Sequence, residues 1–153
     1  MNRDSLTSSI IEHEGYRKTP YKDHLGIWTV GYGTNIHNRR LQDAHLQTVG
    51  SLLEWLCDPV QHQAWLDEHI DRSINEARDW LGLRPWNILS DAQREVIAEM
   101  FYQMGATRMS AFVKFKSALR GGNYPLAKRE MLDSRWARQT PGRALDLSEK
   151  FYS

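Results

Sequence analysis

Two acidic side chains and one hydroxyl lie close together in a single N-terminal stretch, Glu14–Gly33, EGYRKTPYKDHLGIWTVGYG. A partly desolvated Glu14 could act as a general acid, and Asp23 supplies a second carboxylate. Thr29 adds a hydroxyl that could hold a water molecule. These three side-chain types are the groups needed to hydrolyse a glycosidic bond.

Each of the three residues also has a simple structural explanation. A glutamate at the end of a helix is usually solvated, and aspartate is a common residue of hairpin turns. Threonine is a frequent residue in strands. The chemical interpretation of Glu14, Asp23 and Thr29 therefore depends on a fold that brings them together.

The element that must carry Glu14 is a short N-terminal helix. Asp4 or Ser5 is expected to cap its start, and Leu6 and Ile10 begin an apolar stripe. Glycine commonly ends a helix in the left-handed conformation, so Gly15 is expected to end this one directly after Glu14.

A β-hairpin is predicted for residues 19–36, where the helical period disappears and glycine alternates with aromatic and β-branched residues. The turn is expected at Asp23–Gly26, and a third short strand is expected within residues 34–41. Such a hairpin would fold back towards the helix that carries Glu14.

Most of the remaining chain has helical periodicity. A long amphipathic helix is predicted after Pro59, with an end near Gly82, and another begins at Ser90 and stops at Gly105. Residues 43–63 give no clear pattern, although LLEWL could form a helical turn. Three further short helices are expected at 110–119, 125–133 and 142–151.

These elements predict an α+β fold that is mostly helical, in one domain of residues 1–153. Residues 1–60 would form a small lobe with the first helix and a hairpin or three-stranded sheet. The long helix, at about 60–82, would join it to a helical lobe at about 83–153.

The composition is that of an ordered globular protein, with 41% hydrophobic and 25% charged residues. Residues 1–84 carry 9 Lys/Arg against 12 Asp/Glu, whereas residues 85–153 carry 11 against 7. This asymmetry could attract an anionic partner, but no basic stripe of the kind that binds nucleic acid is present. The lone cysteine, Cys57, excludes an internal disulfide and is expected to be a small filler.

The spacing of Glu14, Asp23 and Thr29 within Glu-Gly-Tyr and Tyr-Lys-Asp-x-x-Gly-x-x-Thr-x-Gly-x-Gly resembles the catalytic region of the phage T4-type lysozymes. Two later blocks, MFYQMG at 100–105 and SRWARQTPGR at 134–143, are similar to C-terminal motifs of that family in the same order. The resemblance runs from Leu6 to Tyr152 and is weakest at residues 37–63.

The resemblance implies a lysozyme-like fold and hydrolysis of the β-1,4 bond between N-acetylmuramic acid and N-acetylglucosamine in bacterial peptidoglycan. Glu14 would protonate the leaving oxygen, and Asp23 and Thr29 would hold a water on the opposite face, with inversion at the anomeric carbon. No cofactor is implied, and the histidines show no metal-ligand spacing.

Residues from the C-terminal motifs are also assigned roles by the resemblance. Tyr102 and Gln103 would contact the glycan, although Tyr102 could equally belong to the apolar face of its helix. Arg143 would orient Glu14, or could be an ordinary solvated arginine. Trp136 is expected in the core.

The sequence departs from the family pattern at a few positions. A histidine and an acid of the long helix often form a pair in the family, and the matching positions here are Thr34 and His69. Glu99 replaces a smaller polar residue, and an extra carboxylate near the glycan site could raise the pH optimum. An unchanged pH–rate profile in Glu99→Gln would contradict that expectation.

The biological setting implied by the resemblance is an endolysin that digests the host wall at the end of phage infection. No apolar stretch of the length of a membrane span or signal peptide is visible, so we expect a protein of the host cytoplasm that inserts into no membrane. We also expect a monomer, which fits a cleft enzyme that works on a solid polymer. A holin-type protein would then give access to the wall in the periplasm. The alternatives are a lytic transglycosylase, and a virion-associated or non-catalytic peptidoglycan-binding domain.

Overall fold

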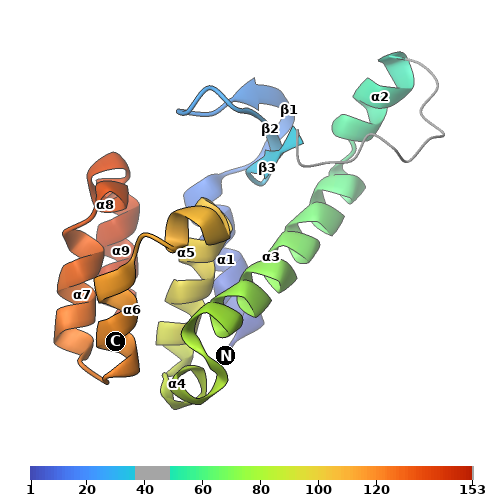
Figure 1. Ribbon diagram of the computed structural model, residues 1–153. Helices are drawn as coiled ribbons and strands as arrows, with labels where there is room; N and C mark the ends of the chain where they lie inside the picture. The colour runs from blue at the N-terminus through green and yellow to red at the C-terminus, as the bar shows by residue number, and fades with distance from the viewer. Residues whose placement is uncertain (37–48, 153) are drawn as a thin grey trace. The chain divides into compact units, whose positions relative to one another are not determined.

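The computed structural model describes residues 1–36 and 49–152 (Figure 1). The chain divides into two compact units, one of residues 9–69 and the other of residues 1–8 with 70–153. The divisions fall inside the first helix, α1 (Arg3–Glu14), and inside the long helix, α3 (Pro59–Leu81). The first turns of α1 therefore group with the C-terminal part of the chain, whereas the sequence placed residues 1–60 together.

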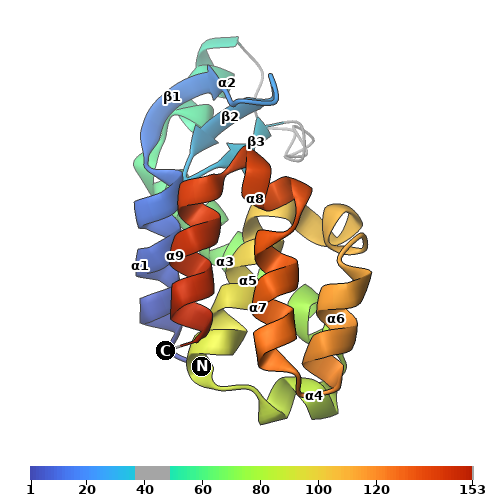
Figure 2. The ribbon, with the colours of Figure 1, turned by 90° about the vertical axis from the view of Figure 1, so that its left-hand side faces the viewer.

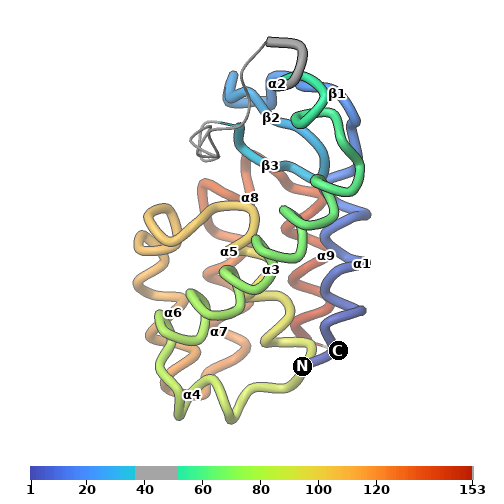
Figure 3. The backbone as a smooth tube through the Cα atoms, turned by 90° about the vertical axis from the view of Figure 1, so that its right-hand side faces the viewer, coloured from blue at the N-terminus to red at the C-terminus, as the bar shows by residue number. Residues whose placement is uncertain are grey.

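The unit of residues 9–69 contains a three-stranded antiparallel sheet in the order β1-β2-β3 (Figure 3). The strands are β1 (Arg17–Lys22), β2 (Trp28–Gly31) and β3 (Thr34–Asn35). The turn between β1 and β2 is the predicted one, because the backbone N–H of Gly26 donates to the carbonyl of Asp23 at 2.9 Å. The predicted third strand is also confirmed, as the two-residue β3.

Helix α2 (Val49–Leu56) and the first half of α3 complete this unit. Both agree with the sequence, in which LLEWL could be helical and Asp58-Pro59 indicated a helix start. The Asp58 side chain caps α3 by accepting from the backbone N–H of Val60 at 2.9 Å. Residues 43–48 of the segment without a clear pattern, and residues 37–41 of the range in which the third strand was expected, lie outside the described residues.

Helix α1 begins two or three residues earlier than the sequence suggested. The side chain of Asn2 accepts from the backbone N–H of Ser5 at 3.1 Å, so Asn2 is the N-cap rather than Asp4 or Ser5. At the other end Gly15 adopts φ +70°, and its N–H donates to the carbonyl of Ile11. This left-handed glycine ends the helix directly after Glu14, as predicted.

The unit that contains residues 70–153 is helical throughout its described part (Figures 1 and 2). After α3 it contains α4 (Leu83–Ile88), α5 (Asp91–Met109), α6 (Val113–Arg120), α7 (Tyr124–Leu132), α8 (Arg135–Gln139) and α9 (Pro141–Phe151). Figure 2 shows α9 beside both α5 and α7, and residues of these helices contact one another. A continuous apolar core joins them, with Phe101, Phe115, Trp136 and Phe151 at its largest positions.

Helix α5 begins at Ser90, as predicted, and a capping box forms there. Gly105 stops the regular helix, also as predicted, because its φ of +75° and ψ of 167° are not helical, and a second helical segment follows it to Met109. Two other helices of this unit differ from the sequence-based expectation. Helices α4 and α8 were not predicted, because each has too few residues to show an apolar period. The mostly helical α+β fold itself is confirmed. Among residues 1–36 and 49–152, no helix combines the length and apolar character that a membrane crossing requires.

Candidate active site

Glu14 is the last residue of α1, and its half-buried carboxylate lies against the end of the hairpin. A Cβ atom placed on Gly33 would lie 2.7 Å from Oε2 of Glu14 and 3.1 Å from Cδ. Real Cβ atoms do not approach other atoms so closely, and Gly33 also has φ +79°. Glycine at position 33 therefore suits the left-handed conformation, and any side chain there would have to displace the carboxylate of Glu14.

Asp23 uses one carboxylate oxygen to build the hairpin turn. Its Oδ1 accepts from the backbone N–H groups of Leu25 at 2.8 Å and Ile27 at 2.9 Å. Its Oδ2 accepts no hydrogen bond from the residues that the structure describes. The second oxygen is thus available to accept a proton from a water or a substrate hydroxyl.

Thr29 lies on β2 and is only 3% exposed. Its hydroxyl donates to the carbonyl of Ile27 at 2.9 Å. Because the hydroxyl proton is already engaged, the oxygen can act towards a further partner only as an acceptor.

Tyr21 is the residue that links the three predicted groups. It is the cross-strand partner of Thr29, which places the two side chains on the same face of the hairpin. The pKa of the Tyr21 phenol is raised, first by burial and then by the negative charge of Glu14; Arg17 opposes the rise and Asp23 adds to it. Tyr21 is therefore paired with Thr29 in the sheet and lies within electrostatic reach of both Glu14 and Asp23.

Tyr21 is not among the predicted site residues, although the sequence contains a signal for it. Tyr21 comes two residues before Asp23, and a turn at Asp23–Gly26 pairs it with Thr29. A raised pKa keeps the phenol protonated at neutral pH, so Tyr21 is a neutral hydrogen-bond donor among groups that mainly accept.

The predicted glycan-binding residues lie in the other unit and can be described within it. Both polar atoms of the Gln103 amide form hydrogen bonds. Oε1 accepts from Nε1 of Trp136 at 2.7 Å, and Nε2 donates to Oγ1 of Thr140 at 3.3 Å. Trp136 is in the core, as predicted, with 2% exposure. Tyr102 is 4% exposed, which fits its alternative placement on the buried face of α5. Glycan contacts by Tyr102 and Gln103 stay predictions.

Arg143 has a carboxylate partner within its own unit. Its Nε and Nη2 donate to Oε1 of Glu99 at 3.3 and 3.1 Å, and Glu99 is fully buried. The guanidinium compensates the charge of Glu99, which reduces the influence that this extra carboxylate could have at a distance. Orientation of Glu14 by Arg143 stays a prediction, as does the proposed effect of Glu99 on the pH optimum.

Thr34, which replaces the histidine common in the family, is 3% exposed. Its hydroxyl has no hydrogen-bond partner among the described residues. A buried hydroxyl without a hydrogen-bond partner lowers the stability of the fold, so the hydroxyl of Thr34 is expected to destabilise the sheet.

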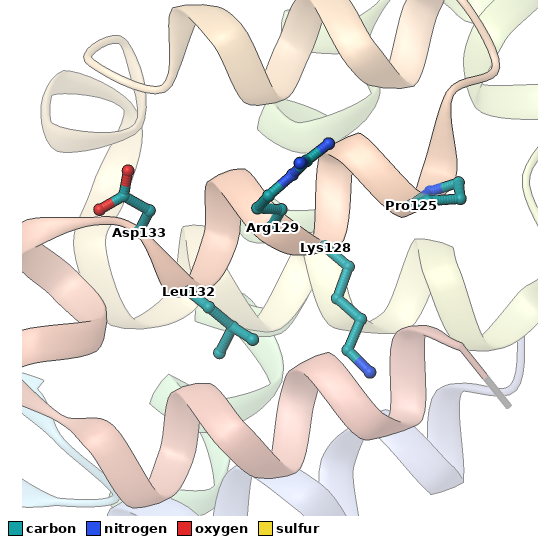
Figure 4. A pocket seen from close by; sticks show the side chains of 5 residues that line it. All are labelled: Pro125, Lys128, Arg129, Leu132 and Asp133. Carbon is teal, nitrogen blue, oxygen red and sulfur yellow. The ribbon is translucent and has the colours of Figure 1, made fainter.

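The described residues contain no group of histidine, cysteine, aspartate and glutamate side chains arranged to hold a metal ion. An open pocket of about 510 Å³ lies on α7, and Figure 4 shows the side chains that line it: Pro125, Lys128, Arg129, Leu132 and Asp133. None of the predicted site residues is among them. The pocket therefore takes no part in the chemistry considered below.

Comparison with known proteins agrees with the geometry. The sequence profile of the family described as Phage lysozyme matches residues 11–148. A relative, the "Probable T4-type lysozyme 2" of Dictyostelium discoideum, is 26% identical over 151 residues, which cover 92% of this chain and 89% of that protein. The chain therefore belongs to the phage lysozyme family and is a lysozyme-like peptidoglycan hydrolase of the glycosidase type.

Proposed function

We propose that the protein is an N-acetylmuramidase that cleaves the β-1,4 bond between N-acetylmuramic acid and N-acetylglucosamine with inversion. The observation that carries this proposal is the geometry of the hairpin: Tyr21 pairs with Thr29 beside the turn that Asp23 builds, and Gly33, which follows β2, lies against the carboxylate of Glu14. One acid and a separate water-holding pair are the groups that an inverting glycosidase uses.

In the proposed reaction Glu14 donates its proton to the glycosidic oxygen, and the bond from that oxygen to the anomeric carbon breaks. The developing positive charge on the sugar is stabilised by the carboxylate of Asp23. A water on the opposite face attacks the anomeric carbon and loses a proton to Asp23. The products are a new reducing end and the released hydroxyl of the neighbouring sugar.

The hydrogen bonds of Asp23 and Thr29 support the water-holding role. Oδ2 of Asp23 and Oγ1 of Thr29 both offer acceptor capacity, and neither can donate to the water. A water that donates one hydrogen bond to each keeps its lone pairs for attack on the sugar. Replacement of Thr29 by valine would remove one of these acceptors.

The natural setting that we propose is lysis of a bacterial host by a phage endolysin. The enzyme would act as a monomer on peptidoglycan in the periplasm, after a holin-type protein has permeabilised the membrane. No nucleic acid, cofactor or metal takes part in this proposal.

The decisive comparison is between wild type and Glu14→Gln. We expect wild type to clear outer-membrane-permeabilised Gram-negative cells and Glu14→Gln to be slower by roughly 100-fold or more, because general acid catalysis is lost. Equal clearing by the two proteins would contradict the role of Glu14. Circular dichroism would show that the variant keeps its fold.

Analysis of the products separates the proposal from its enzymatic alternative. Hydrolysis gives reducing N-acetylmuramic acid ends, whereas a lytic transglycosylase gives 1,6-anhydro ends. Mass spectrometry of digested peptidoglycan distinguishes the two, and anhydro products would overturn the proposed hydrolysis. A protein that binds the wall and releases no fragments would indicate a non-catalytic domain.

A further inference from the structure

His62 is a fully buried histidine on α3 that contacts several separate segments of the unit of residues 9–69. A Cβ atom on Gly31 would lie 3.0 Å from Cγ of His62, so the imidazole packs directly on the backbone of β2. The ring also lies 5.9 Å from the Trp65 ring and 5.5 Å from the Tyr16 ring, measured between centroids.

Two hydrogen bonds select one tautomer of the neutral imidazole. Nε2 lies 2.5 Å from the carbonyl oxygen of Leu56, which can only accept, so Nε2 carries a proton. Nδ1 lies 2.8 Å from the hydroxyl of Tyr16. In the neutral imidazole Nδ1 has no proton, and it therefore accepts from the phenol.

Tyr16 is well suited to remain the donor in this chain of hydrogen bonds. The pKa of its phenol is raised by desolvation first, and then by the nearby Tyr32 and Asp58. The ring of Tyr32 lies 4.7 Å from that of Tyr16 and covers one side of it. The phenol thus stays protonated at neutral pH.

The position of Tyr16 gives these contacts a functional meaning. Tyr16 follows Glu14 by two residues, with only the left-handed Gly15 between them. The backbone that leaves the catalytic acid is thereby attached to His62, and His62 is packed against the strand that carries Thr29. A shift of Tyr16 would be transmitted to the carboxylate of Glu14 through this short connection.

We propose that His62 is a positioning residue for catalysis, which holds the segment after Glu14 against the hairpin through its hydrogen bond to Tyr16. The inference rests on the proposed function, in which Glu14 is the acid. An ordinary core histidine would stabilise the fold without any preference for this bond. The two readings therefore differ in which of the two hydrogen bonds of His62 matters for turnover.

A matched pair of substitutions separates the two bonds. In His62→Asn the amide oxygen can occupy the place of Nδ1 and accept from Tyr16, but the donor to Leu56 is lost. In His62→Gln the amide nitrogen can occupy the place of Nε2 and donate to Leu56, but the acceptor for Tyr16 is lost. Both variants remove one buried hydrogen bond from the same site.

We expect Tyr16→Phe and His62→Gln to lower kcat roughly tenfold with little change in KM, because small displacements of a catalytic group are costly. His62→Asn should retain most of kcat. Tyr152→Phe, at an exposed tyrosine of the other unit, serves as the control and should match wild type. All are assayed on purified peptidoglycan beside wild type and Glu14→Gln.

Equal values of kcat in His62→Asn and His62→Gln, or wild-type kcat in Tyr16→Phe, would overturn the positioning role. Tyr16 is 42% exposed and its ring is retained, so Tyr16→Phe decides the matter if the His62 variants fail to fold. Absence of hydrolysis by wild type would instead refute the proposed function. In that case the measurement is the ¹³C chemical shift of the Glu14 carboxyl at fixed pH. A change of this shift in Tyr16→Phe but not in Tyr152→Phe would support the positioning role of His62. No change in either variant would refute that role.

Discussion

At the scale of single residues, the site depends on the contact between Glu14 and the backbone of Gly33. The carboxylate occupies the place that any Cβ atom at position 33 would need. This contact brings the end of α1 against the hairpin. It also gives a direct way to displace Glu14 without changing its chemistry.

We expect Gly33→Ala to lower activity by roughly tenfold to a hundredfold, because the new methyl group must push the acid from its place. The matched control is Gly122→Ala, since Gly122 has φ +70° and no atom within 4 Å of the added Cβ, and lies in the other unit. Both variants carry a similar backbone strain of about 1–2 kcal/mol, but only one touches Glu14. Thermal unfolding and peptidoglycan hydrolysis would be measured in parallel. Equal activities of the two variants would show that the contact is unimportant.

At the scale of elements, the turn of the hairpin and the chemistry share one residue. Oδ1 of Asp23 closes the turn through the backbone N–H groups of Leu25 and Ile27, while Oδ2 is left for the reaction. The same side chain therefore shapes the connection from β1 to β2 and supplies the proposed base. Separate substitutions can remove one function or both.

Asp23→Asn should keep the turn and lose the base. The amide oxygen can still accept from both backbone N–H groups, whereas the negative charge is gone. We expect thermal stability to stay near that of wild type and activity to fall roughly 100-fold or more. Asp23→Ala should lose both the turn hydrogen bonds and activity. An active Asp23→Asn would exclude Asp23 as the base.

At the scale of the whole molecule, the charge distribution follows the division into units. By sequence, residues 9–69 carry 5 Lys/Arg and 8 Asp/Glu, while residues 1–8 with 70–153 carry 15 and 11. The unit that holds Glu14, Asp23 and Thr29 is thus net negative, and the other is net positive. An anionic polymer would be attracted by the second.

We therefore expect the hydrolysis of intact, anionic wall material to slow as salt rises from about 20 mM to about 200 mM, because screening weakens this attraction. Lys114→Glu with Arg120→Glu, at two exposed positions of α6, should weaken wall binding and flatten the salt dependence. The charge-preserving control is Lys114→Arg with Arg120→Lys. Rates that are independent of salt in wild type would argue against electrostatic attraction to the wall.

The sequence by itself determined the parts of this protein that depend on neighbours along the chain. The end of α1 at Gly15, the turn at Asp23–Gly26 and the start of α5 at Ser90 follow from local conformational preferences. The candidate acid and water-holding pair came instead from the resemblance of the spacing of Glu14, Asp23 and Thr29 to the catalytic region of the T4-type lysozymes. Helices α4 and α8 were not predicted, because so few residues cannot show an apolar helical period.

Only the tertiary structure decided which distant side chains support those residues. Tyr16 and His62 are 46 residues apart, Gln103 and Trp136 are 33 apart, and Glu99 and Arg143 are 44 apart. No local pattern specifies such pairs, because they form only after helices and strands have packed and buried polar groups must find partners. The sequence therefore identified the candidate catalytic groups, whereas packing determined what holds their surroundings in place.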